Sequence, residues 1–99
     1  MIHVLAFITA KPGQRAAVLE AFTANIPAVR AEVGCIEYGA AVDIAGANPA
    51  FGPDSFVVIE KWESMAALRA HAVSPHMAAY AATVKDLIEK RAVHVLDPA

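Results

Sequence analysis

The chain has 99 residues and a formal net charge of −2, and 58% of its residues are hydrophobic. This length suits one fold, so we predict a single domain over residues 1–99. The scattered basic residues form no stripe or run, which argues against nucleic acid or a membrane surface as a partner. No apolar stretch is long enough to span a bilayer. One cysteine cannot form an internal disulfide and no signal peptide is evident, so we predict a cytoplasmic protein.

The first third of the chain contains a strand signal followed by a helix signal. Residues 2–9 are rich in β-branched and aromatic side chains, which predicts a strand that ends at Lys11-Pro12-Gly13. An apolar stripe with helical spacing then predicts a helix over residues 14–33. Pro27 should kink or break this helix, and Gly34 should end it as the C′ residue.

The rest of the chain predicts three strands and a broken helix. Residues 35–44 form the second strand, with Ile36, Tyr38, Ala40 and Val42 on one face, and a loop over 45–54 leads to a third strand over 56–62. Ser64 can cap a helix that restarts at Ser74-Pro75, with an apolar stripe that continues to Leu87 and Ile88. Residues 92–96 form a short final strand. The order β-α-β-β-α-β predicts an α+β, ferredoxin-like subunit with a broken second helix.

The first and third strands are apolar on both faces. Ile2, Val4, Ala6 and Ile8 share one parity of the first strand, whereas Leu5 and Phe7 share the other. Because helices cover only one face of such a sheet, the other face would leave large apolar side chains exposed. We therefore predict a homodimer in which two sheets pack face to face.

Three segments resemble a known family. They are Lys11-Pro12-Gly13 before the first helix, the run Glu32-Val33-Gly34-Cys35-Ile36-Glu37-Tyr38, and the strand end Glu60-Lys61-Trp62 followed by His71, Ser74-Pro75-His76 and Tyr80. In this order and spacing the chain resembles the antibiotic biosynthesis monooxygenase domain family over nearly its whole length. Val33 stands where the family commonly has proline, a difference that concerns the end of the helix rather than the chemistry.

The resemblance implies a dimeric α/β barrel with a pocket between sheet and helices in each subunit. It also implies a cofactor-independent monooxygenase that oxidises a quinol or polyphenolic aromatic with molecular oxygen, without metal or flavin. Such chemistry needs a base, a hydrogen-bond donor and a dry aromatic wall. Relatives that degrade haem use an asparagine on the first strand, and residues 2–9 contain none.

Six residues are candidates for the site, and each also has a structural explanation. The candidate catalytic residues are His71, Glu60 and His76, and the candidate substrate-binding residues are Trp62, Tyr38 and Tyr80. His71 can act as a base near neutral pH or simply pack its helix. Glu60 shares a strand face with Trp62, so it can serve as an acid or base, as a partner for His71, or in an ion pair with Arg69.

The remaining candidates can likewise belong to the core or the surface. His76 can face solvent, and the three aromatic residues can be packing residues. No metal shared by the two histidines is expected, because neither cysteine nor clustered carboxylates complete such a site. The alternative function is a non-enzymatic dimer of the same fold that binds small aromatics or acts in stress. A third is an isomerase or decarboxylase that shares the fold.

Overall fold

The sheet is built around the first strand. The computed structural model describes all 99 residues. Strand β1 (Ile2–Ala10) pairs on one side with β3 (Ser55–Trp62) and on the other with β4 (Ile88–Leu96), and β2 (Cys35–Ala41) pairs with β3 at one edge. All pairs are antiparallel, in the order β2-β3-β1-β4. The predicted α+β, ferredoxin-like arrangement is confirmed.

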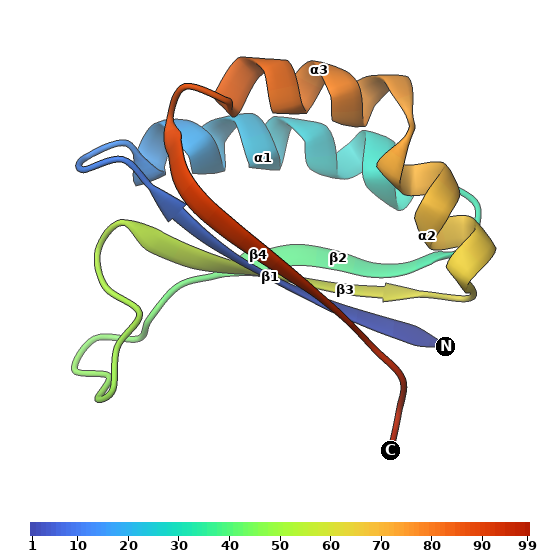
Figure 1. Cartoon of the computed structure of the whole chain (residues 1–99), viewed down its shortest axis with the longest axis horizontal. Coiled ribbons are helices and arrows are strands. Elements are labelled where there is room, and N and C mark those ends of the chain that lie inside the picture. The colour runs from blue at the N-terminus through green and yellow to red at the C-terminus, as the bar shows by residue number, and fades with distance from the viewer.

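Three helices lie on one face of this sheet. Figure 1 shows α1 (Arg15–Arg30) and α3 (Pro75–Val84) running together across the sheet, with α2 (Met65–Ala72) at one end. The predicted break of the second helix at Ser74-Pro75 is therefore also confirmed. None of the helices is long and apolar enough to cross a membrane.

Buried and less buried side chains alternate along β1 and β3, and the buried ones form the core beneath the helices. Even-numbered residues of both strands face the helices, because side chains of a strand point alternately to its two faces. The buried members of this set are Val4, Ala6, Ile8, Ala10, Phe56, Val58, Glu60 and Trp62. Helix α1 adds Val18, Phe22 and Val29 at near-helical spacing. Glu60 is the only charged residue in this row, directly opposite Val4.

Two serines stand at the N-cap positions of α2 and α3. The Ser64 side chain accepts a hydrogen bond from the Ala67 N–H at 3.2 Å, which caps α2 as predicted. Ser74 occupies the N-cap position of α3 and Pro75 the first helical position. The Ser74 hydroxyl donates instead to the His71 carbonyl at 2.8 Å, so it ties the end of α2 to the start of α3.

Helix α1 differs from its predicted form. Pro27 lies inside one continuous helix over 15–30 and does not divide it. Its ring is exposed, so the face of the helix where proline removes a backbone hydrogen bond is turned toward solvent. The helix ends at Arg30, before Val33, which is 90% exposed. Gly34 is therefore not the C′ residue that the sequence predicted, because it lies further along, at φ +85° in the turn that leads to β2.

The bounds of the two edge strands also differ. The register of β2 shifts between Cys35 and Glu37, where Ile36 lies, and the strand ends at Ala41, before Val42. Only Tyr38 and Ala40 of the predicted face therefore share the covered face, and Tyr38 alone is buried. Helix α3 ends at Val84, and β4 begins at Ile88 rather than at residue 92. The reason is that β1 pairs with this segment along its whole length, from Ala10 with Ile88 to His3 with Leu96.

Candidate functional site

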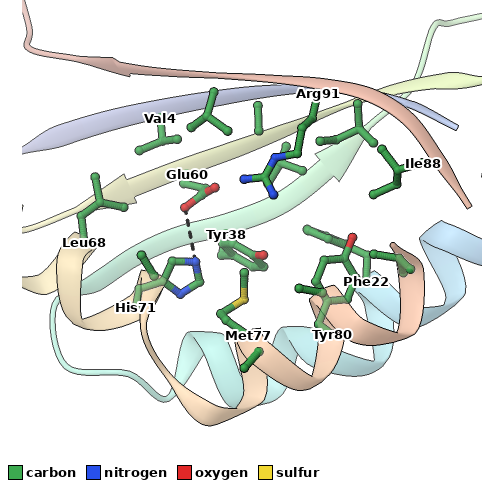
Figure 2. A pocket seen from close by; sticks show the side chains of 18 of the residues that line it. Val4, Phe22, Tyr38, Glu60, Leu68, His71, Met77, Tyr80, Ile88 and Arg91 are labelled. Atoms are coloured by element: carbon green, nitrogen blue, oxygen red, sulfur yellow. Dashed lines mark ion pairs between the residues drawn. The ribbon is translucent and has the colours of Figure 1, made fainter. Parts of the chain in front are cut away.

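A cavity of about 670 Å³ lies between the sheet and helices α2 and α3. Most of the residues that line it are hydrophobic, and they come from every strand and every helix. Figure 2 shows the sheet above this space and the helices below it, with polar side chains reaching in from both layers. This volume and this lining are typical of sites for small organic ligands.

His71 is the only histidine that lines the cavity. It lies in the last turn of α2, lines the cavity and is only 4% exposed. Its Nδ1 lies 2.8 Å from Oε2 of Glu32, a residue of the turn between α1 and β2. Because an ionised carboxylate only accepts hydrogen bonds, His71 donates its Nδ1–H to Glu32. This bond fixes both the orientation and the tautomer of the ring.

The tautomer leaves the other nitrogen of His71 with a free lone pair. Nε2 lies 3.9 Å from Oε1 of Glu60, too far for a hydrogen bond, and both residues line the cavity. The dashed line in Figure 2 marks this pair. A carboxylate that holds one imidazole nitrogen while the other faces a cavity is the arrangement of a general base.

Glu60 is held by Trp62 rather than by His71. The Trp62 Nε1–H donates to Glu60 Oε1 at 2.9 Å, and Glu60 is 7% exposed. Burial raises the pKa of Glu60 above its usual value, whereas the Trp62 hydrogen bond and the nearby His71 offset part of this rise. Glu60 therefore keeps its proton to a higher pH than an exposed glutamate.

Trp62 is not placed as the sequence predicted. It is completely buried and does not line the cavity, and its indole N–H is already bonded to Glu60. Trp62 therefore does not contact the cavity, which its selection for substrate binding would require. Its ring packs against His71, with 4.6 Å between ring centroids. Trp62 supports both polar residues from behind.

His76 lies beside the site but not in the cavity. Its Nε2 bonds to the same Glu32 Oε2 that holds His71, at 2.9 Å, and its ring borders a shallower hollow between α1 and α3. Glu32 therefore joins the two histidines, a role that sequence reasoning missed. The available signal was its place in the run Glu32-Val33-Gly34-Cys35, which carried the family resemblance.

Glu32, His71 and His76 are also the one group of side chains able to hold a metal ion. One potential ligand atom from each lies within 4.8 Å of the other two. The sequence argument against a shared metal assumed that no carboxylate accompanies the histidines, and the fold supplies one. Both histidines are hydrogen-bonded to one oxygen of this carboxylate, so the cluster is satisfied as a polar network that orients His71.

Two tyrosines line the cavity, as their selection for substrate binding requires. Tyr38 is 3% exposed and stacks on Phe22, with 5.1 Å between ring centroids. Burial raises the pKa of Tyr38 far above its usual value, with a further rise caused by the charge of Glu60. Tyr38 therefore stays protonated throughout the physiological range and can donate a hydrogen bond. Tyr80 borders the cavity on the α3 side.

Replacing Glu60 with glutamine should stabilise the fold increasingly as pH rises. A carboxyl group whose pKa is raised on folding contributes most to stability below its unfolded pKa, and this contribution is lost as pH rises through the folded pKa. Glutamine has no charge to desolvate and keeps an oxygen for the Trp62 N–H. Urea unfolding of both proteins between pH 4 and 8 should show a difference that grows with pH. A constant difference would contradict the raised pKa.

Comparison with known proteins places this site in a family. Residues 1–83 match the antibiotic biosynthesis monooxygenase family. The chain belongs to the antibiotic biosynthesis monooxygenase family. It is 42% identical to a protein of Escherichia coli K12 named "Probable quinol monooxygenase YgiN", over 99% of this chain and 98% of the relative. Both findings support a monooxygenase-type function for this member of the family.

Solved structures show the same fold. Rv0793 from Mycobacterium tuberculosis is 32% identical, with a TM-score of 0.83 over 99% of this chain and 94% of that one. A crystal structure of an antibiotic biosynthesis monooxygenase is 26% identical, with a TM-score of 0.85 over 100% of this chain and 99% of the other. The family resemblance and the ferredoxin-like fold are thus confirmed over nearly the full length of the chain.

Proposed function

We propose that this chain is a cofactor-independent monooxygenase that oxidises a quinol or polyphenolic aromatic with molecular oxygen. The observation that carries the proposal is the part-buried hydrogen bond between His71 and Glu32, which leaves the His71 Nε2 free at a largely apolar cavity of about 670 Å³. A planar hydroxyarene fits the apolar lining, and its hydroxyl would meet the one oriented base. Similarity to a protein named as a probable quinol monooxygenase supports the same substrate class.

The reaction begins with proton transfer. His71 Nε2 takes the proton of a substrate hydroxyl, and Glu32 stabilises the imidazolium that forms. The electron-rich phenolate passes an electron to oxygen, and the two radicals combine to form a carbon–oxygen bond at a ring carbon that bears hydrogen. Apolar walls exclude water from this pair. The protein positions the substrate, provides the base and excludes water, and the substrate itself supplies the electrons.

The resulting ring hydroperoxide then loses water. The imidazolium of His71 has protonated the peroxide anion first formed, so the neutral imidazole can now take the proton of the ring C–H. As that C–H bond and the O–O bond break, the distal oxygen leaves as water and the proximal oxygen stays on the ring as a carbonyl. For a naphthohydroquinone, one quinol and one O₂ give one hydroxynaphthoquinone and one water. Glu60, whose pKa is raised by burial, is the acid placed to protonate the departing oxygen. Tyr38 donates a hydrogen bond from the cavity wall.

Oxygen consumption tests the function directly. We expect the purified protein, treated with a chelator and free of flavin, to accelerate oxygen uptake with naphthohydroquinones or anthrones above the rate without protein. With ¹⁸O₂, one labelled atom should enter the product, and no hydrogen peroxide should accumulate. Uptake at the protein-free rate would contradict the proposal, and tight binding without turnover would favour a non-enzymatic aromatic-binding protein. Peroxide as the sole oxygen product would indicate an oxidase instead.

We also propose that the protein is a homodimer joined through its sheets. The face of the sheet away from the helices carries Leu5, Phe7, Val57 and Ile59, with no helix over it (Figure 1). Covering such side chains contributes about 1.5–3 kcal/mol for each one fully buried. Light scattering at micromolar concentration should give twice the chain mass of 10.4 kDa. A stable monomer at that concentration would contradict this assembly.

A further inference from the structure

The side of the cavity formed by β4 and the adjoining end of α3 carries positive charge. Arg91 of β4 pairs in register with Ile8, so its side chain lies on the face of the sheet that the helices cover. Figure 2 shows its guanidinium pointing into the cavity, toward the side of Glu60, with Tyr80 across the space. Lys85, just after α3, and Arg69 of α2 also line the cavity.

These cations have no protein partner. Of the residues that line the cavity, Glu60 is the only one with a carboxylate, and it is bonded to Trp62. The ion pairs of the molecule join Lys61 to Glu37 and the two histidines to glutamates, so Arg69, Lys85 and Arg91 are in none of them. The three residues are exposed, so their charges lie at the open side of a mostly apolar cavity, where they attract a ligand that carries negative charge.

Arg91 and Tyr80 both line the cavity, and both carry hydrogen-bond donors. Burial raises the pKa of the Tyr80 hydroxyl, and the positive charge of Arg91 offsets part of this rise. Tyr80 therefore stays protonated and donates, while the planar guanidinium presents two parallel N–H groups. That combination matches the two oxygens of a carboxylate.

We infer that the cavity selects hydroxyarenes bearing a carboxylate, which binds between the Arg91 guanidinium and the Tyr80 hydroxyl. The inference rests on the proposed function for the placement of the reacting hydroxyl. Figure 2 shows His71 and Tyr80 toward opposite ends of the cavity, with Arg91 over the space between them. A fused two-ring acid with hydroxyl and carboxylate at opposite ends suits this arrangement, since its rings would contact the apolar lining.

Binding of two matched compounds tests the inference without turnover. 6-Hydroxy-2-naphthoate and 2-naphthol share rings and hydroxyl and differ in the carboxylate. By calorimetry we expect the acid to bind the wild-type protein roughly 10- to 100-fold more tightly, the scale of a charge-assisted hydrogen-bond pair. Arg91→Gln should remove this preference and leave the affinity for 2-naphthol unchanged. Arg91→Lys keeps the positive charge but not the two parallel N–H groups, so it should retain part of the preference for the acid.

Lys90→Gln is the matched control. Lys90 precedes Arg91 on β4 and pairs with Thr9, so the same charge is removed from the opposite face of the sheet. It should keep the preference for the acid. Equal affinity of the wild-type protein for the two compounds, or an equal loss in both variants, would overturn the inference.

The outcome is separable from that of the proposed function. Selective binding of the acid without oxygen uptake would uphold the anion site and contradict the monooxygenase. Oxygen uptake with neutral quinols, but no preference for acids, would uphold the monooxygenase and overturn the anion site.

Discussion

Replacing His71 with alanine should lower the rate of oxygen consumption on a quinol roughly 100-fold or more, the usual scale for the loss of a general base. No other lining residue combines an imidazole nitrogen with an orienting carboxylate, since His71 is the only histidine of the cavity. The measurement is oxygen uptake under saturating substrate, with dimer mass and urea unfolding measured on the same preparation. Binding of 2-naphthol should change far less than turnover.

Two further variants separate catalysis from structure. Glu32→Gln leaves an amide beside Nδ1 that can donate as well as accept, so His71 can adopt the tautomer whose Nε2 carries the proton. This variant should lose much of the activity of the base while its fold persists. His94→Gln, on the other face of the sheet, is the histidine control and should keep wild-type turnover. If His71→Ala turned over normally, His71 would not be the base and Glu60 would be tested next.

The sequence predicted the parts of the fold that depend on near neighbours. Two-residue alternation placed Glu60 and Trp62 on the covered face of β3, and Ser64 and Ser74-Pro75 correctly marked the starts of two helices. Local signals failed where pairing with another strand decided the outcome. Ile88 looked like the continuation of a helical stripe, yet β1 needs a partner opposite Ala10, and the chain becomes a strand there.

The candidate site was predicted in its central residue but not in its connections. His71 and Glu60 do meet in one cavity. Glu32 was missed because it lies 39 residues before His71, and only the packing of α2 against the turn after α1 brings the two together. Nothing in the sequence indicated that the Trp62 N–H would bond to Glu60, two residues away on the same strand face. That bond holds the indole behind the cavity instead of leaving its N–H free for a substrate.

Replacing Gly34 with alanine should destabilise the protein more than any other single added methyl group in its turns. A Cβ at Gly34 would lie 2.5 Å from the Ala67 Cβ, and the glycine has φ +85°, which other residues rarely adopt. The backbone conformation costs about 1–2 kcal/mol and the overlap with α2 about 1–3 kcal/mol. We therefore expect a loss of about 2–5 kcal/mol in the free energy of unfolding, measured in urea.

Gly46 provides the control for backbone conformation alone. It has φ +78° and no atom within 4 Å of an added Cβ, so Gly46→Ala should show only the smaller cost. Adding Ala67→Gly to Gly34→Ala removes the overlapping methyl group but not the strained φ. The double variant should therefore be less destabilised than the sum of the two single variants, because neighbouring residues are not additive.

The same substitution should affect the site, because the turn and α2 meet there. Gly34 follows Glu32 by two residues, and its carbonyl accepts a hydrogen bond from the Glu63 N–H at 2.9 Å, just before α2 begins. An added methyl group would push α2, and His71 with it, away from the turn that carries Glu32. Turnover of the folded Gly34→Ala protein should therefore fall, and Ala67→Gly should restore part of it. If Gly34→Ala were as stable as Gly46→Ala and turned over normally, α2 would not pack closely against this turn. The packing would then not be what orients His71.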